Sequence, residues 1–504
     1  MNQSHRAHGS ASSPGPGMSG HLVRLAIAAS VLLVGCQSAA PGTAVPPTAG
    51  PSPSAATPSA EAPAPSMEPT ATARPATGTW VEAGELNVPR EAPHVVLLGD
   101  GRVLAVGDDG AQGQWGTFCG ASESSVVAEL WDPATGDWTT TAPLATPRAH
   151  SVALPLADGR AMVTAGANAM SQSWEIGGYQ SYSSTWIFDP RTESWTKAGE
   201  LETARTALVG AVLPDGRILV AGGFFADVFR WDDYPELARD VACPRPQGDV
   251  HADVVTAAWR PGGPFADVAP EPPPGRLLVT AEVFDPATGR WSRTGPLAVP
   301  RVGQSTVTLG DGRVLVAGES ETGYGYFYGL WTEDERAARV AEVYDAATGR
   351  FRVTGEYPVE QDRWNPDAVL VATADGGALL IEGAAWATWD ESDPEATVPA
   401  SPILRYDPGT NQWTEAGSLA VGRLQPAVAL LPDGRVLVAG GEDQYGPTLT
   451  TEIYDPATGM TTPGAPMPEP RAGARAVVLQ DGSVLLVGGY GRHTSMAVRY
   501  VPGP

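Results

Sequence analysis

The sequence has very little positive charge. Its 504 residues include 57 acidic side chains but only 32 basic ones, of which Lys197 is the single lysine, and the formal net charge is -25. A surface that binds a nucleic-acid backbone needs clustered cations. This charge balance therefore excludes nucleic acid as the expected partner.

Long hydrophobic runs are also missing. The clearest apolar run, Leu25 to Val34, has ten residues, whereas a helix needs roughly 20 to cross a bilayer. Because the run follows Arg24 near the N-terminus, it is typical of a signal-peptide core. We expect no membrane-spanning helix there.

Aromatic residues are scarce at 7%, whereas 59 glycines and 48 prolines make up about a fifth of the chain. Glycine and proline interrupt helices and mark turns. This composition is too rich in turns for a helical bundle, and it suits many short strands joined by turns.

The apolar run ends in Leu33-Val34-Gly35-Cys36, which resembles the lipobox of bacterial lipoproteins. The resemblance implies that residues 1–35 are a lipoprotein signal peptide and that the Cys36 thiol takes a lipid, which would anchor an exported chain to the outer side of a bacterial membrane. The alternative is an ordinary secretory signal with an incidental cysteine.

Residues 36–78 form a distinct stretch. Positions 37–78 contain ten prolines, no aromatic residue, and mostly Ala, Ser, Thr and Gly otherwise. A segment with so little to bury cannot offset the entropy of ordering. We interpret it as a disordered tether that acts only as a spacer.

From residue 79 onward the chain repeats two anchors in a fixed order. The first is an Asp-Gly turn followed by a short apolar run, which is a strong hairpin signal because glycine adopts positive φ without strain. Its seven copies begin at Asp100, Asp158, Asp215, Asp311, Asp375, Asp433 and Asp481.

The second anchor is an aromatic residue with another large residue seven positions later. The pairs are Trp131/Trp138, Phe188/Trp195, Phe284/Trp291, Tyr344/Phe351 and Tyr406/Trp413, while Tyr454 is followed by Thr461 and Tyr500 lies near the end. Repeats at this spacing predict a sevenfold array of sheets.

The two ends of the array complement each other. The last unit stops at Pro504 without an outer strand, whereas residues 75–80 (PATGTW) match the second half of the turn at 286–291 (PATGRW). We therefore expect the N-terminal strand to complete the last unit. A circular array needs this closure to avoid two open sheet edges.

These residues resemble the kelch family, in which a Gly-Gly doublet follows an inner strand and precedes the spaced aromatic pair. Doublets occur at 222–223, 440–441 and 488–489, and the second glycine is missing after Gly107, Gly166, Gly318 and Gly383. The resemblance implies an all-β fold, with residues 79–504 forming a seven-bladed kelch-type β-propeller closed by the N-terminal strand.

In such a blade, strands a to d run outward from the axis. The Asp-Gly and Asp-Pro turns then lie on one face, here called the turn face, and the b–c and d–a connections lie on the other, the long-loop face. The b–c connections include a long insertion at 223–279 in blade 3 and a shorter loop at 319–339 in blade 4. Loops of this length are usually functional or disordered.

The b–c loops are rich in large side chains interleaved with acids. Aromatic rings beside carboxylates suit sugars, which stack by their apolar faces, or organic cations. The alternative is a lid in which the loops bury their own aromatic residues. The binding candidates are Trp231, Trp259, Tyr324, Tyr326, Tyr328, Trp331, Arg363, Trp364, Trp386 and Trp389.

An arginine recurs ten residues before the hairpin aspartate, at Arg90, Arg148, Arg205, Arg301, Arg423 and Arg471. This spacing places the arginines at the start of the innermost strands, on the long-loop face. The ring could bind a carboxylate or phosphate. Repetition in each blade favours a structural role, with pairing to carbonyls or carboxylates of a neighbouring blade. Arg363 is out of register, twelve residues before Asp375.

Two cysteines remain after lipidation, Cys119 and Cys243, and both fall in b–c loops. Since disulfides persist in exported compartments, we predict that they form one, with two free thiols as the alternative.

Support for catalysis is weak. The histidines after residue 36, which include His251 and His493, are too scattered for a metal-ligand spacing, so no catalytic residue, metal or cofactor is predicted. Galactose-oxidase-like copper radical oxidases share the architecture and use two Tyr, two His and a Tyr–Cys cross-link. Nothing in this chain matches their motifs residue by residue.

The sequence therefore predicts a lipid-anchored binding module of the cell envelope. Its expected partner on the long-loop face is an extracellular glycan, a wall polymer or a protein, and the lipid would contact the membrane. A copper oxidase and a purely structural surface scaffold remain alternatives.

Overall fold

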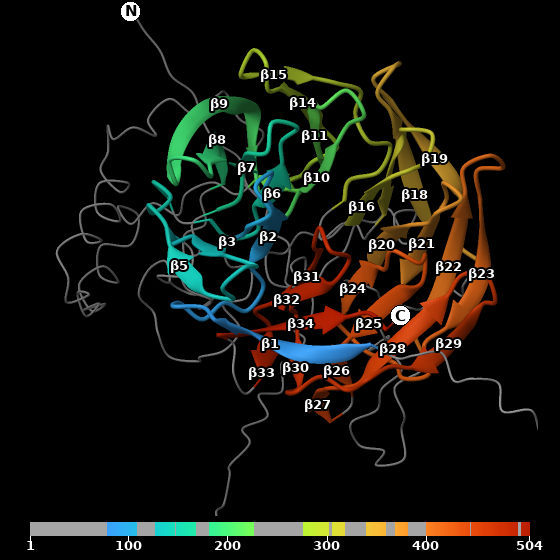
Figure 1. Cartoon of the computed structure of the whole chain (residues 1–504). Coiled ribbons are helices and arrows are strands. Elements are labelled where there is room, and N and C mark those ends of the chain that lie inside the picture. Colours follow the sequence, from blue (N-terminus) through green and yellow to red (C-terminus); the bar gives the residue numbers. More distant parts are fainter. Residues whose placement is uncertain are drawn as a thin grey trace, which may run out of the picture. The chain divides into compact units, whose positions relative to one another are not determined.

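The computed structural model describes residues 78–107, 126–146, 148–167, 181–225, 276–301, 305–317, 339–358, 368–381, 400–443, 445–491 and 495–503. Within these residues, seven four-stranded antiparallel sheets are arranged around a central axis (Figure 1). No helix among the described residues is long and apolar enough to span a bilayer. The expected seven-bladed, all-β propeller is confirmed.

Each blade runs from an inner strand a to an outer strand d. Blade 1 is β2 (His94–Leu97), β3 (Val103–Val106), β4 (Glu129–Trp131) and β5 (Trp138–Thr140); blade 2 is β6 (Val152–Pro155), β7 (Ala161–Thr164), β8 (Tyr182–Asp189) and β9 (Ser194–Arg205); blade 3 is β10 (Val209–Val212), β11 (Ile218–Ala221), β14 (Ala281–Asp285) and β15 (Arg290–Arg293). Blade 4 is β16 (Ser305–Thr308), β17 (Val314–Ala317), β18 (Val340–Asp345) and β19 (Arg350–Glu356); blade 5 is β20 (Val369–Ala372), β21 (Ala378–Ile381), β22 (Pro402–Asp407) and β23 (Gln412–Ser418). Blade 6 is β24 (Ala427–Leu430), β25 (Val436–Ala439), β28 (Thr451–Asp455) and β29 (Met460–Pro463); blade 7 is β31 (Arg475–Val478), β32 (Val484–Val487), β34 (Met496–Val501) and β1 (Thr79–Glu85).

Three two-stranded ribbons lie outside the seven sheets; two are within b–c connections, and the third pairs the connection that precedes blade 7 with the b–c connection of that blade. They are β12 (Phe224–Phe225) with β13 (Arg276–Leu277), β26 (Glu442–Asp443) with β27 (Gly446–Pro447), and β30 (Arg471–Ala472) with β33 (Tyr490–Gly491). The first ribbon forms the base of the blade 3 insertion.

The N-terminal strand closes the ring, as the sequence predicts. β1 pairs antiparallel with β34, with Thr79 opposite Val501 and Trp80 opposite Tyr500. The rings of Trp80 and Tyr500 lie 5.2 Å apart, and the Gly78 N–H donates to the Tyr500 hydroxyl at 3.0 Å. The first strand of the chain thus supplies the outer strand of the last blade.

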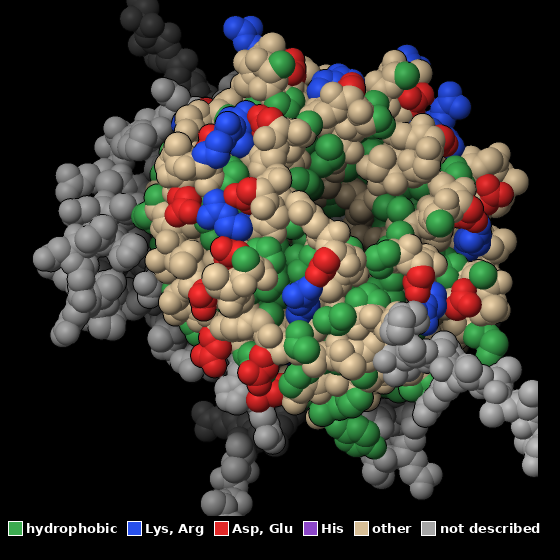
Figure 2. Space-filling model, viewed as in Figure 1, with side chains coloured by type: hydrophobic (Ala, Val, Ile, Leu, Met, Phe, Trp, Pro, Cys, Tyr) green, Lys and Arg blue, Asp and Glu red, His purple; other side chains and the backbone are tan. Residues whose placement is uncertain are grey.

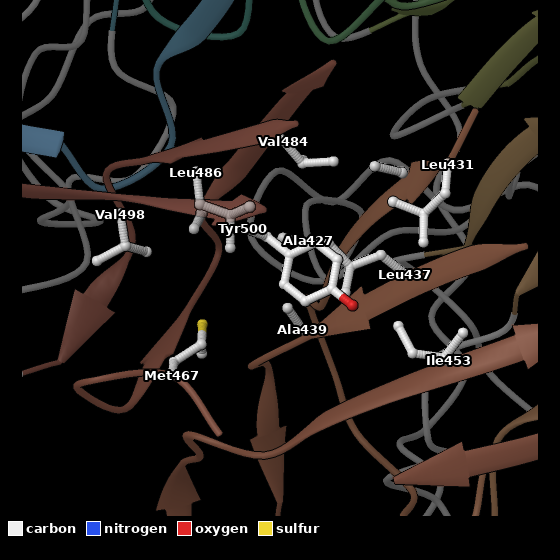
Figure 3. Packing of buried hydrophobic residues seen from close by; sticks show 12 residues of the cluster. Ala427, Leu431, Leu437, Ala439, Ile453, Met467, Val484, Leu486, Val498 and Tyr500 are labelled. Atoms are coloured by element: carbon white, nitrogen blue, oxygen red, sulfur yellow. The ribbon is translucent and has the colours of Figure 1, made fainter. Parts of the chain in front are cut away.

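The core lies between blades because both faces of each strand b are covered. The b strands, such as Val436–Ala439 and Val484–Val487, are buried at each position. Between blades 6 and 7, Leu437 and Ile453 of one blade form a cluster with Leu486, Val498 and Tyr500 of the next (Figure 3). Burial on two faces explains why these strands read as continuous apolar runs rather than alternating ones.

The spaced aromatic residues face each other across strands c and d, as in the Phe284–Trp291 and Tyr406–Trp413 pairs, whose rings lie 5.1 Å apart. The tryptophan of the pair also links blades, since its indole N–H donates to an oxygen of the preceding blade. These bonds run from Trp80 to Ala465, Trp138 to Ala83, Trp195 to Ala142, Trp291 to Thr185 and Trp413 to Thr354.

The Asp-Gly turns carry a repeated ion pair. In blades 1, 2, 3, 4 and 6 the aspartate pairs with an arginine two residues later, as Asp215 does with Arg217. Blades 5 and 7 have Gly377 and Ser483 at that position, and there the arginine comes from strand c: Arg405 pairs with Asp375 and Arg499 with Asp481. In the space-filling view, basic and acidic side chains lie next to each other around a central hollow (Figure 2).

These turns predict a loss of stability in acid. Hydrogen bonds from Arg160 and Arg217 lower the pKa of Asp158 and Asp215, and those from Thr373 and then Arg405 lower the pKa of Asp375 to about 2. An aspartate whose pKa is lower in the folded than in the unfolded chain (roughly 3.9) stabilises the folded state at pH values above the unfolded pKa. This stabilisation is lost as the pH falls below the folded pKa. We expect the melting temperature to fall between pH ~4 and pH ~2. Asp375→Asn should melt below the wild type at neutral pH, and the two should converge near pH 2.

Candidate functional site

The six in-register arginines lie at the long-loop end of the innermost strands and are buried, with exposed fractions of 0% for all but Arg471, at 3%. Five of them donate to the carbonyl oxygen of the residue seventeen positions later, just after strand b: Gly107, Ala165, Gly222, Gly440 and Gly488. A guanidinium with no exposed surface cannot contact a ligand directly. These contacts favour the structural interpretation over an anion-binding ring.

The structure corrects the expected partners of this ring. Among the described residues, these guanidinium groups donate mostly to acceptors in the blade that each arginine begins, and Arg205 also donates to Thr203 of β9 in the preceding blade. The link to the preceding blade is made by the main chain, because the carbonyls of Arg205, Arg301 and Arg471 accept the N–H groups of a glycine there. Each of these arginines therefore joins two consecutive blades.

Four arginines have a buried glutamate partner on strand c. The ion pairs are Arg90–Glu129 at 3.3 Å, Arg205–Glu282 at 2.9 Å, Arg301–Glu342 at 3.3 Å and Arg423–Glu452 at 2.5 Å. The same glutamate accepts the main-chain N–H groups two and three residues before the arginine, as Glu342 does from Ala298 and Val299. Burying both charges is tolerated because they are paired and hydrogen-bonded.

Blades 2 and 7 keep the arginine without that glutamate. Arg148 donates to Ala165 and to the carbonyl and hydroxyl of Ser184, and it lies over the ring of Tyr182, 4.9 Å from its centroid. Arg471 donates to the carbonyls of Gly488 and Met496. Burial lowers the pKa of both arginines to about 10, so both stay protonated at neutral pH.

The residue two positions after the arginine defines the axial end of the long-loop face. There, His150, Ala207, Gln425 and Gly473 have φ between 48° and 74°, in the left-handed region. Successive blades are joined at this level, because Ala207 donates its N–H to the His150 carbonyl and Gly473 to that of Gln425. Only glycine adopts this conformation without strain.

A polar and aromatic surface joins blades 6 and 7 beside this ring. The Tyr490 hydroxyl donates to Glu442 Oε2 at 2.5 Å, and the main chains of Leu424 and Glu442 pair with each other. Tyr445, at the tip of the β26–β27 hairpin, is 89% exposed. Sequence reasoning missed these residues, because this short b–c loop has no unusual length or composition.

The other predicted site residues lie outside the described residues. They are the binding candidates Trp231, Trp259, Tyr324, Tyr326, Tyr328, Trp331, Arg363, Trp364, Trp386 and Trp389, the lipidation residue Cys36, the predicted disulfide Cys119 and Cys243, and the histidines His251 and His493. Within the described part of the chain, no three His, Cys, Asp or Glu side chains come together as metal ligands.

Comparison with known proteins identifies the type of propeller. No family model matches the chain. It is 28% identical over 168 residues to Kelch-like protein 25 of Xenopus tropicalis, which covers 33% of this chain and 24% of that protein. Its fold is similar to that of a novel fungal alcohol oxidase of the AA5 family solved in complex with copper, with a TM-score of 0.54 and 19% identity over 85% of this chain and 76% of that one. The chain is a kelch-type β-propeller.

The kelch-type propeller matches about a quarter of the length of its curated relative. The structure of YjhT is also similar, with a TM-score of 0.41 and 14% identity over 82% of this chain and 94% of that one. At 19% identity the likeness to the alcohol oxidase shows the fold alone, and a shared fold does not determine function.

Proposed function

We propose that this kelch-type propeller is an exported binding module, held by lipid on Cys36 to the outer side of a bacterial membrane. Its long-loop face binds a glycan, a wall polymer or a protein of the envelope, with a glycan as the first candidate. The observation that carries the proposal is the difference between the two faces.

The turn face repeats one structural motif in each blade, an Asp-Gly turn whose aspartate pairs with an arginine. Blades differ instead in the length and composition of their b–c connections, which include 223–279 in blade 3 and 319–339 in blade 4. Because the Asp-Gly turn joins strands a and b, each b–c connection starts at the other end of strand b, away from the turn face. Binding surfaces usually lie on variable loops that a regular scaffold holds in place.

The loop composition supports a glycan ligand. Tryptophan and tyrosine residues alternate there with aspartate and glutamate, for example Trp231 beside Asp232 and Trp389 beside Asp390. Sugar rings stack on aromatic faces while their hydroxyls bond to carboxylates.

The test substitutes three loop aromatics at once, Trp231→Ala, Tyr326→Ala and Trp386→Ala. We expect the full-length protein in detergent to be retained on immobilised envelope polysaccharide, and the triple variant to lose that retention with an unchanged melting temperature. The control replaces three exposed apolar residues of outer strands, Val81, Val353 and Met460, by alanine and should be retained. If the loop variant is retained equally well, the aromatic loops form a lid and this site is wrong.

A copper oxidase is a second candidate because of the fold likeness to the copper-bound alcohol oxidase. Under that reading His251 or His493, tyrosines, and Cys119 or Cys243 would hold the metal. The described residues supply no cluster of metal-ligating side chains to support it, so no step is derived through copper. A purely structural scaffold would bind neither glycan nor copper.

A further inference from the structure

We infer that blade 2 contains a buried chloride site, formed by Arg148, Thr146 and Trp186, at the place where four other blades hold a glutamate carboxylate. The inference goes beyond the proposed binding function and does not depend on it. The ion supplies the negative charge that strand c does not provide in this blade.

Arg148 has the same place in its blade as the other arginines of the ring. It donates to the carbonyl of Ser184, two residues before Trp186, at 3.0 Å. In blade 4, Arg301 donates to the carbonyl two residues before Glu342 at 2.7 Å. Trp186 therefore stands on strand c where the other blades place the carboxylate.

The main-chain groups that bind this carboxylate are kept in blade 2. In the four blades with the glutamate, it accepts the N–H groups of the residues three and two positions before the arginine. In blade 2 these residues are Ala145 and Thr146, and both carry an N–H. Leu144, just before them, lies in the same apolar cluster as Trp186. The indole thus lies beside this segment.

Three side-chain donors of these residues are buried without an acceptor among the described residues. They are Nε of Arg148, the hydroxyl of Thr146 and the indole N–H of Trp186. No described residue accepts the N–H groups of Ala145 or Thr146 either. Since nearly all buried polar groups in folded proteins are bonded to protein, to water or to an ion, this set of donors calls for an acceptor.

The charge of Arg148 selects an anion over a water molecule. Burial lowers the pKa of its guanidinium to about 10, so it is protonated at neutral pH. Among the described residues, the titratable group that acts on it is Tyr182, whose pKa burial raises to about 12 and which is therefore neutral. A buried charge is tolerated when it is paired.

Blade 7 also lacks the glutamate, but it differs in both respects. The carboxylate of Glu469 acts on Arg471 and raises its pKa against the effect of burial. Pro468, three positions before that arginine, has no N–H to satisfy. Blade 2 is thus the blade that keeps the donors and has no acid on strand c.

The enclosure of the site selects a small ion. Arg148 and Thr146 are both 0% exposed, which leaves no access for a phosphate or a carboxylate that is part of a larger ligand. Chloride is spherical and accepts several N–H and O–H donors at once. The exposed side chain of Ala145 places the site near the surface, so the ion can exchange with solvent.

The test measures urea unfolding of the full-length protein in detergent, in sodium chloride and in sodium gluconate at equal ionic strength. An ion that binds only the folded chain raises the folded-to-unfolded ratio about tenfold for each tenfold rise in its concentration above Kd. We expect this dependence in chloride and in bromide, and none in gluconate.

Two variants should abolish the dependence on chloride. Trp186→Glu supplies the carboxylate of the other blades, and Arg148→Met removes the cation. The matched controls are Met460→Glu, which adds the same charge at a side chain that is 63% exposed, and Arg471→Met, which removes the arginine of blade 7. Both controls should keep the dependence of the wild type.

Equal stability in chloride and gluconate would overturn the inference, because it is the result expected if water or another carboxylate of the chain fills the place. A dependence that persists in Arg148→Met and Trp186→Glu would also overturn it, since the ion would then bind elsewhere. If these variants do not fold, crystals of the wild type grown in bromide decide. We expect an anomalous peak beside Arg148, and its absence would contradict the site.

Discussion

Replacing Glu342 by alanine is expected to lower the free energy of unfolding by about 3–5 kcal/mol. The substitution removes the carboxylate that lies 3.3 Å from the guanidinium of Arg301, which is buried with 0% exposure. It also removes the acceptor for the N–H groups of Ala298 and Val299. Removing one partner of a buried ion pair lowers the free energy of unfolding far more than forming the whole pair raises it.

Urea unfolding followed by tryptophan fluorescence measures this loss. The double variant Arg301→Leu with Glu342→Leu should recover much of it, since no isolated charge remains. Glu200→Ala, which breaks the exposed Lys197–Glu200 pair, is the control and should cost less than about 1 kcal/mol. A loss that small for Glu342→Ala would show that the buried pair does not stabilise the blade.

Deleting residues 78–85 is expected to abolish the cooperatively folded propeller. The deletion removes β1, exposes the edge of β34, and uncovers the ring of Tyr500. The deletion also removes the half-buried Trp80 side chain that packs against the core of blades 6 and 7, and the hydrogen bonds between β1 and β34. Typical domains have only about 5–15 kcal/mol of stability in total.

Limited proteolysis and thermal unfolding of the truncated chain test this prediction. Deleting eight residues of the proposed tether, 60–67, is the control of equal length and should leave the melting temperature unchanged. Recovery of a protease-resistant core on addition of a 78–86 peptide would show that the loss comes from the missing strand. An unchanged melting temperature after deletion of 78–85 would contradict closure of the propeller by β1.

The fold was predictable from the sequence because its signals are local and repeated. The Asp-Gly turns fix seven hairpins, and the aromatic pair seven residues apart fixes strands c and d. The half-motif before Trp80 then identifies the closing strand. Each signal depends on turn chemistry within about ten residues, which tertiary contacts do not override.

For the buried ion pairs, the sequence predicted the arginine but not its glutamate partner. The arginine was identified from its spacing, but its partner was not, although Glu129, Glu282, Glu342 and Glu452 each stand two residues before the aromatic anchor. A search for residues that recur together in the same blades would have found them. It would also have found Arg405 and Arg499, which appear in strand c only where the Asp-Gly turn lacks its own arginine.

The surface between blades 6 and 7 could not be predicted in this way. Gln425 has a left-handed backbone conformation, as His150 and Ala207 do at the same position, and a glutamine does not reveal this in the sequence. Tyr490 and Glu442 are separated by 48 positions and meet only because consecutive blades are joined at the axis.

The most direct test of a binding function is the retention of the full-length protein on deproteinised envelope polysaccharide, measured with and without copper loading and followed by elemental analysis. We expect retention that a metal chelator does not change and no stoichiometric copper. Absence of retention together with one bound copper per chain and alcohol oxidation would contradict a binding function.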